Sequence, residues 1–114
     1  MGQYEDARAE ARNVLREVAR RRETITYGEL VARIHALQLD PHGGVLAQIL
    51  DELSTEEHSQ GHGMLSAVVV HATDDYLPGS GFFELADKLG LAASDKVAFH
   101  AAELHRVHDA HVRA

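Results

Sequence analysis

The chain has 114 residues and a formal net charge of −7, and 45% of its residues are hydrophobic. This length suits one domain, and the composition excludes a collagen-like or plainly disordered chain. Cysteine is absent, which excludes disulfides, thiolate metal sites and a cysteine nucleophile. No apolar run reaches the roughly 18 residues that a membrane span needs, and the start lacks the apolar core of a secretory signal. We therefore expect a cytoplasmic protein without a membrane partner.

Basic residues concentrate at the start of the chain. Residues 1–22 hold six arginines against four acidic residues, whereas the remainder holds five basic residues against fourteen acidic ones. Apolar or small residues at three-and-four spacing predict a helix over 4–22 with one buried face. If the protein binds duplex DNA, we expect the contacts to come from arginines of this helix. These nucleic-acid-binding candidates are Arg12, Arg16, Arg20 and Arg21. The alternative is that the arginines form a solvated helix face.

The middle of the chain predicts a strand, two helices and a second strand. Residues 24–27 are a short β-prone run, and helical spacing follows over 29–36. A third helix is predicted over 45–57; it has four acidic residues and no Lys or Arg, so it would repel a phosphate backbone. We expect these acidic residues to form a solvated face. Residues 64–71 are predicted as the strongest strand, because their nearly continuous β-branched run suggests burial on both faces.

Two further helices are predicted after a turn over 72–81. Phe82 opens a short helix that continues to Leu89, and Gly90 is placed to cap its C-terminus. The last helix is predicted over 95–112, with its apolar residues turned inward. The positions that we expect it to bury are Val97, Ala101, Leu104 and Val107.

Two segments resemble known families. The element order over 24–72, with Ile25-Thr26-Tyr27-Gly28-Glu29-Leu30, resembles the strand-to-helix entry of winged-helix domains, including alkyltransferase-like proteins. This resemblance implies a winged-helix centre in which a strand pair forms the wing. The chain lacks the alkyltransferases' Pro-Cys-His-Arg active site, which excludes their chemistry. The segment Pro78-Gly79-Ser80-Gly81-Phe82-Phe83 is similar to a family of small uncharacterised bacterial proteins, which implies no activity.

The expected fold is therefore α+β: a mostly helical single domain over residues 1–114 with a winged-helix-like centre and a short β-sheet. In this domain the first and last helices are additions at the N- and C-terminal ends of the centre.

A glycine-rich turn joins the second predicted strand to the next helix. Gly79, Ser80 and Gly81 could present backbone N–H groups to an anion at the start of that helix. A Walker-type phosphate loop needs a Lys followed by Ser or Thr after its last glycine, whereas Phe82 and Phe83 stand there. The turn is either a ligand loop or a structural turn that the two phenylalanines fix to the core.

The last helix carries histidines at three-residue spacing. His105, His108 and His111 form two such pairs, and neutral imidazoles at this spacing can chelate zinc, nickel or copper. The side chains of histidines on a single helix converge poorly on one metal ion, so another segment or a second subunit must complete the coordination shell. We expect any metal binding to be weak and coupled to a homodimer. The alternative is a solvated, histidine-rich face.

These features predict a non-catalytic binding module that needs no cofactor, of a bacterial regulatory or nucleic-acid-associated kind. Its partner would be duplex DNA. A protein–protein docking module is the first alternative, favoured by the acidic balance of the chain. The second alternative is a small metal-dependent enzyme that uses the C-terminal histidines.

Overall fold

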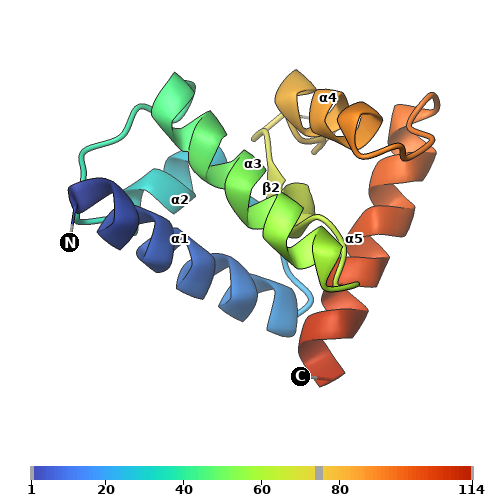
Figure 1. Cartoon of the computed structure of the whole chain (residues 1–114), viewed down its shortest axis with the longest axis horizontal. Coiled ribbons are helices and arrows are strands. Elements are labelled where there is room, and N and C mark those ends of the chain that lie inside the picture. Colours follow the sequence, from blue (N-terminus) through green and yellow to red (C-terminus); the bar gives the residue numbers. More distant parts are fainter. Residues whose placement is uncertain (1, 74–75, 114) are drawn as a thin grey trace.

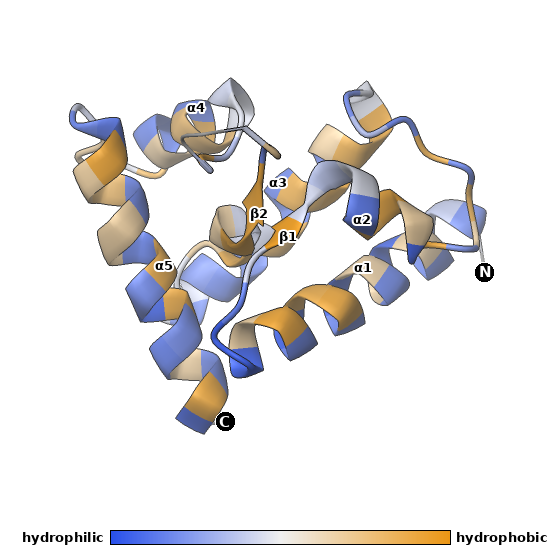
Figure 2. Ribbon diagram, turned by 180° about the vertical axis from the view of Figure 1, so that it is seen from behind, coloured by the Kyte–Doolittle hydropathy of each residue, from blue (hydrophilic) through white to orange (hydrophobic). Residues whose placement is uncertain are grey.

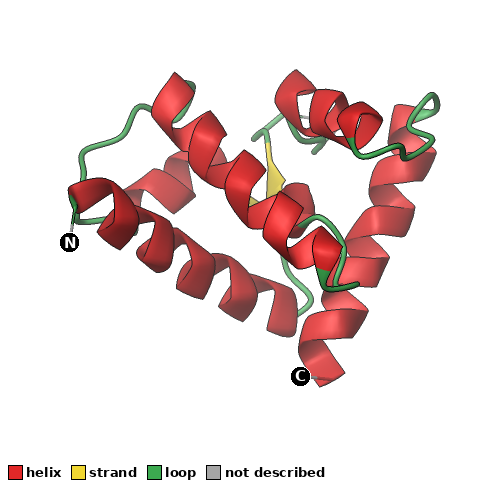
Figure 3. Cartoon of the chain, in the orientation of Figure 1, coloured by secondary structure: helices red, strands yellow, loops and turns green. Residues whose placement is uncertain are grey.

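Helices surround a small pair of strands in the computed structural model, which describes residues 2–73 and 76–113 (Figures 1 and 3). In chain order the elements are α1 (Gln3–Arg20), β1 (Ile25–Thr26), α2 (Tyr27–Ala32), α3 (Gly44–Ser59), the 3-10 helix η1 (Leu65–Val68), β2 (Val69–Val70), α4 (Ser80–Lys88) and α5 (Lys96–Arg113). The predicted class, a mostly helical α+β domain with a short sheet, is confirmed.

The sheet differs from the prediction. β1 and β2 pair in parallel, with Ile25 opposite Val69. A strand over 64–71 was wrong, because its first half forms η1 and two residues form the strand. Leu65 and Val68 are nevertheless fully buried, as predicted. An apolar run that is buried on every side needs no alternation, so it suits a helical turn as well as a strand.

η1 lies at the centre of the molecule, where α1, α3 and α5 pack around it (Figure 1). The inward faces of α1 and α3 follow the predicted spacing, and Figure 2 shows the hydrophobic stripe of α1 facing the interior. The buried hydrophobic residues of these two helices are Ala7, Ala11, Leu15, Val18, Ala19, Leu46, Ile49, Leu50 and Leu53. The predicted strand pair after the third helix is replaced, in the described chain, by η1 and β2.

The inward face of α5 is polar rather than apolar. Val97 is 65% exposed and Ala101 is exposed, so two of the four predicted buried positions were wrong. Val107 is fully buried, but the helix also buries two histidines and Glu103. Each of these polar side chains has a partner in the core, which is why burial does not follow the hydrophobic spacing here.

Candidate functional site

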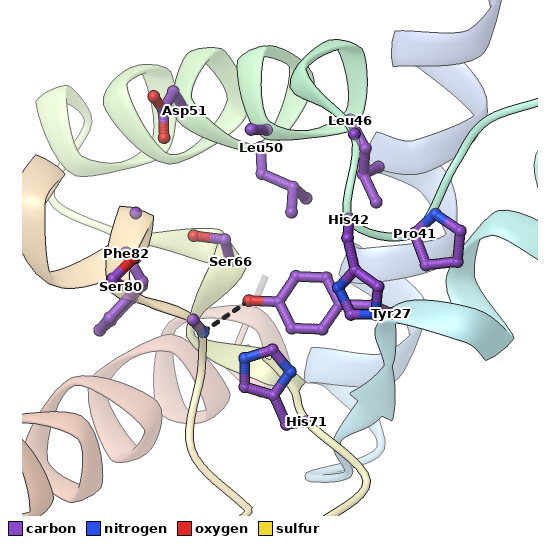
Figure 4. A pocket seen from close by; sticks show the side chains of 14 residues that line it. Tyr27, Pro41, His42, Leu46, Leu50, Asp51, Ser66, His71, Ser80 and Phe82 are labelled. Atoms are coloured by element: carbon purple, nitrogen blue, oxygen red, sulfur yellow. Dashed lines mark hydrogen bonds between the residues drawn. The ribbon is translucent and has the colours of Figure 1, made fainter.

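A cavity of about 260 Å³ opens between α2, the start of α3 and the start of α4 (Figure 4). We call it the aromatic pocket. Three of its rings come from Tyr27 at the start of α2, His42 just before α3 and His71 just after β2, and Phe82 of α4 also lines it. Leu46 and Leu50 of α3 supply apolar wall, as Figure 4 shows. Three segments that are distant in sequence thus contribute to one concave site.

The three rings form one continuous wall of the aromatic pocket. The ring centroids of Tyr27 and His71 lie 4.9 Å apart, and those of His42 lie 6.4 Å from Tyr27 and 6.1 Å from His71. Their planes are tilted by only 30–39° from one another. Such separations are those at which aromatic rings attract one another. The wall presents ring faces and edges to anything that enters the cavity.

Local sequence fixes the position of Tyr27. Thr26 and Glu29 form a capping box: the Glu29 N–H donates to the Thr26 hydroxyl, and the Thr26 N–H donates to the Glu29 carboxylate. The first residue of α2 is thereby held against the start of α4. There the Gly79 N–H donates to the Tyr27 hydroxyl oxygen over 2.8 Å. Burial raises the pKa of the Tyr27 hydroxyl, and this hydrogen bond opposes the rise.

Gly79 allows this close approach. A Cβ at this position would lie 3.2 Å from Nε2 of His71 and 3.4 Å from the Tyr27 hydroxyl oxygen. The predicted ligand loop, Gly79 with Ser80 and Gly81, therefore lies in the wall of the aromatic pocket. Of its three N–H groups, that of Gly79 is already taken by Tyr27.

Two helices begin at the aromatic pocket. α3 starts after Gly43 and α4 after Gly79, and neither helix has a side-chain N-cap or an acidic residue in its first turn. At the start of α4 the partial positive charge is therefore not offset by a residue of the first turn, whereas the Asp40 carboxylate accepts the His42 N–H just before α3.

The other end of the aromatic pocket carries hydroxyl and carboxyl groups. Ser66 of η1 is nearly buried; its N–H donates to the Ser54 hydroxyl, which in turn donates to the Ser66 hydroxyl. Ser66 keeps its own hydroxyl hydrogen for a further acceptor. Burial raises the pKa of Asp51 on α3, while attraction to Lys88 opposes the rise. The pocket thus has a ring-lined end and a polar end.

Sequence reasoning found the glycine-rich turn but missed the three rings. Tyr27 stood in a predicted strand, and His42 and His71 were single histidines in predicted loops or strand ends. Nothing in their spacing marks them as neighbours, because the parallel pairing of β1 and β2 places Tyr27 beside His71, and the segment between α2 and α3 adds His42. The pairing of two strands that are far apart in sequence was the missing information.

The predicted nucleic-acid-binding arginines form ion pairs within the chain. Arg12 pairs with Glu56 at 3.0 Å and Arg16 with Glu57 at 2.6 Å, while Arg20 and Arg21 both pair with Glu17. With the pair of Arg8 and Glu52 at 2.9 Å, the first two contacts join α1 to α3 along a row of charges. The expectation of a solvated acidic face on α3 is wrong for Glu57, which is only 2% exposed.

Buried Glu57 is the centre of a polar group that we call the Glu57 cluster: Arg16, Glu57, His62 and His111. His111 is buried as well, whereas the side chains of Arg16 and His62 are partly exposed. Its carboxylate oxygens lie 2.6 Å from Nη2 of Arg16, 2.9 Å from Nδ1 of His62 and 3.2 Å from Nε2 of His111. Burial alone would raise the pKa of Glu57, but the hydrogen bonds from Arg16 and His62 outweigh it and leave the pKa below its usual value. A cavity of about 420 Å³ borders the cluster.

The three histidines proposed as metal ligands do not converge. His105 is exposed, Nε2 of His108 contacts the Glu23 carbonyl oxygen at 2.9 Å, and His111 is buried in the Glu57 cluster. Within residues 2–73 and 76–113, no group of three or more His, Asp or Glu side chains is arranged to hold a metal ion. Instead, His108 and His111 contact other segments of the chain: His108 contacts Glu23, and His111 contacts Glu57.

Comparison with known proteins returned no matching family model, no matching curated protein and no matching solved structure. No helix in the described part of the chain combines the length and apolar character needed to cross a bilayer. The function is therefore argued from the geometry of the sites.

Proposed function

We propose that this protein is a non-catalytic binding module that takes a small, ring-bearing organic molecule in the aromatic pocket. The observation that carries the proposal is the wall of three rings, Tyr27, His42 and His71, around one cavity of about 260 Å³. Ligand pockets are typically concave and largely apolar, with a few polar groups that set orientation.

The size and chemistry of the pocket restrict the ligand. Drug-sized ligands occupy pockets of roughly 300–1,000 Å³, so this cavity suits a fragment-sized molecule. A flat ring would lie against the aromatic wall, where ring contacts contribute about 0.5–1.5 kcal/mol beyond the buried area. A polar substituent would reach Ser66 and Asp51 at the other end. The ring nitrogens of His42 and His71 form no hydrogen bond within the described residues, so they remain available to a ligand.

Titration with three ring compounds of different charge tests the proposal. Benzoate, benzylamine and adenosine are added separately while backbone amide signals are followed by NMR. Fragments of this size bind with dissociation constants on the order of 1 mM, so millimolar additions are needed. We expect at least one compound to shift the amides of His71 and Gly79 in a saturable way. If none of the three moves these amides, the proposal fails.

A matched pair of substitutions locates the binding. Ala47 is an exposed residue of α3 that lines the mouth of the aromatic pocket, so Ala47→Trp fills the mouth at little cost in folding. Gln48→Trp adds the same bulk at the next exposed position, outside the pocket lining. Binding should be lost in Ala47→Trp and kept in Gln48→Trp. Equal loss in both variants would place the compound elsewhere.

Nucleic-acid binding has less support from the electrostatics. Arg12 and Arg16 already face carboxylates of α3, and a phosphate would have to compete with those ion pairs. The exposed end of α1 keeps Arg20 and Arg21, which share Glu17. Fluorescence anisotropy with a labelled duplex at low salt tests this version. Binding that weakens steeply with salt and depends on Arg20 and Arg21 would favour DNA as the partner.

The remaining alternatives stay predictions. The winged-helix likeness of residues 24–72 rests on the order of strand and helices around α2 and α3, and winged helices can also serve as docking domains. A protein-docking role would be supported by a contiguous apolar surface. The large exposed apolar side chains of the described residues are instead Val45 of α3, Tyr76 before α4, and Val97 and Val112 at the two ends of α5. A metal-dependent enzyme would need ligands that the C-terminal histidines do not supply together.

A further inference from the structure

The Glu57 cluster places both ring nitrogens of His111 against hydrogen-bond acceptors. Nδ1 lies 2.9 Å from the carbonyl oxygen of Val107, and Nε2 lies 3.2 Å from a carboxylate oxygen of Glu57. A carbonyl oxygen only accepts, so Nδ1 carries a hydrogen. A neutral imidazole has one N–H, which would leave a lone pair on Nε2 facing the carboxylate. A favourable contact at Nε2 therefore needs one more proton between His111 and Glu57.

Burial makes this proton important. His111 is 7% exposed and Glu57 is 2% exposed, so solvent screens the contact between the two side chains only weakly. At 3.2 Å the contact is an ion pair when His111 is protonated, whereas an unprotonated Nε2 would face the carboxylate as a second acceptor, which is costly. The second carboxylate oxygen of Glu57 is held by Arg16, so the carboxylate cannot easily turn away from His111.

We propose that a proton on His111, which lets this side chain pair with Glu57, latches the C-terminal end of α5 onto α3, and that losing this proton at higher pH loosens residues 108–113, while the contacts of His108 with Glu23 and of Asp109 with Arg22 remain. This loosening would distinguish the two halves of α5. In the first half, Glu103 accepts the Met64 N–H over 2.7 Å, and Nε2 of His100 contacts the Ala67 carbonyl oxygen at 2.8 Å. Neither of these contacts needs an extra proton, so the first half should stay docked.

Other charged groups near His111 modulate the latch without replacing it. On α1, Arg16 disfavours an additional positive charge, while Glu17 is already paired with Arg20 and Arg21. In the loop after α3, Nδ1 of His62 contacts the same oxygen of Glu57 as His111 does. Arg16, Glu17 and His62 line the cavity of about 420 Å³ that borders the Glu57 cluster.

On α5 itself, Asp109 pairs with Arg22 at 3.5 Å and with Arg113 at 3.4 Å, so its carboxylate is directed to arginines. Of the carboxylates that the structure describes, Glu57 is the one within ion-pair distance of His111. The latch thus depends on one identified acid and one identified base.

Hydrogen exchange of the full chain at about pH 6 and about pH 9, corrected for intrinsic exchange rates, tests the latch. These values lie on either side of the range in which imidazoles ordinarily titrate. We expect amides of residues 108–113 to exchange roughly tenfold faster at the higher pH, the size expected for losing a buried hydrogen bond. Amides of α3 and of the first half of α5 should change little. Equal protection of 108–113 at both pH values would overturn the proposal.

Two substitutions identify the acid. In Glu57→Gln the neutral amide can donate to a neutral ring nitrogen, so the pH dependence of residues 108–113 should disappear. Glu56→Gln is the matched control, because Glu56 is the neighbouring acid, is exposed and pairs with Arg12 instead, so this variant should keep the wild-type pH dependence.

A spectroscopic measurement on the wild-type protein tests the latch without any substitution, so it remains informative if a variant fails to fold. The ring nitrogen signals of His111 should show two N–H groups at a pH where exposed His105 shows one. If both rings lose a proton over the same pH range, Glu57 does not hold the proton on His111 and the latch is refuted.

Discussion

The aromatic pocket and the Glu57 cluster use polar groups in opposite ways. In the Glu57 cluster, one buried carboxylate contacts Arg16, His62 and His111, which come from three separate segments. In the aromatic pocket, the imidazoles of His42 and His71 contact rings but form no hydrogen bonds through their nitrogens within the described residues. Polar groups that partner one another hold helices together, whereas polar groups left open around a cavity can recognise a ligand. The Glu57 cluster thus joins α1, α3 and α5, and the aromatic pocket is the region that we propose for binding.

The largest effect should follow from removing the central acid of the Glu57 cluster. Glu57→Ala leaves Arg16 and His111 without their common partner in a largely buried place. We expect the free energy of unfolding to fall by about 3 kcal/mol, at the lower end for a broken buried ion pair because Arg16 is partly exposed. Urea denaturation measures this loss.

Glu56→Ala is the control for that substitution. It removes an ion pair of similar length, with Arg12 at 3.0 Å, but the Glu56 side chain is 46% exposed. An exposed pair contributes about 0–1 kcal/mol. Equal losses in the two variants would show that burial does not distinguish the Glu57 cluster from the rest of the α1–α3 contact.

Acid should weaken the Glu57 cluster by protonating its central carboxylate. The pKa of Glu57 in the folded chain lies below its usual value of 4.5, so the unfolded chain binds protons more readily. The stability gained from this carboxylate is fully present above about pH 4.5 and is lost as the pH falls through the lower folded value. Denaturation at a series of pH values between about 3 and 6 should show this loss. Glu57→Gln should flatten that part of the curve, and an unchanged slope would contradict the assignment.

The fold was predictable where hydrophobic spacing alone sets the structure. α1 and α3 follow that spacing within a few residues, because their buried faces consist of small and aliphatic side chains. The prediction was wrong for Leu65–Val68 and for the inward face of α5. In the first segment, complete burial removes the periodicity that distinguishes a helix from a strand. In α5, buried His100 and Glu103 are stabilised by partners in distant segments, and no local pattern shows those partners.

The sequence predicted some residues of each site but not which of these residues lie together. The glycine-rich turn, Arg16 and His111 were each singled out for a different chemistry, and the structure places them in two regions that spacing did not define. His111 and Arg16 meet at Glu57 because α1, α3 and α5 all pack around η1. A single sequence identifies residue types that suit a site, but tertiary packing decides which of them meet.

In the aromatic pocket, the next largest effect should come from Gly79. Gly79→Ala places a Cβ against His71 and Tyr27 and puts alanine at a helix N-cap, where it is disfavoured. We expect a loss of about 1–2 kcal/mol in the free energy of unfolding. Thermal denaturation measures the loss, and a variant as stable as wild type would show that the contact between α2 and α4 tolerates a side chain.

Tyr27→Phe should have a smaller effect on the same contact. It keeps the ring that stacks on His71 but leaves the Gly79 N–H without its acceptor. Because this site is only partly buried and water can reach the amide, we expect a loss of about 1 kcal/mol. Amide exchange at Gly79 should accelerate in the variant. Unchanged exchange would mean that the hydroxyl does not hold the start of α4 in solution.

The smallest effect, and one of opposite sign, should come from Gly81, two residues further along the same loop. A Cβ at Gly81 would meet no atom within 4 Å, and the residue already lies in the first turn of α4 without a positive φ. Alanine there restricts the unfolded chain without strain in the folded one, so Gly81→Ala should stabilise the protein by about 0.5 kcal/mol. A rise in the melting temperature of a few degrees would be the expected reading for a chain of this size. A destabilised Gly81→Ala variant would show that the two glycines are equally constrained, and that the close approach at Gly79 is not what sets this turn.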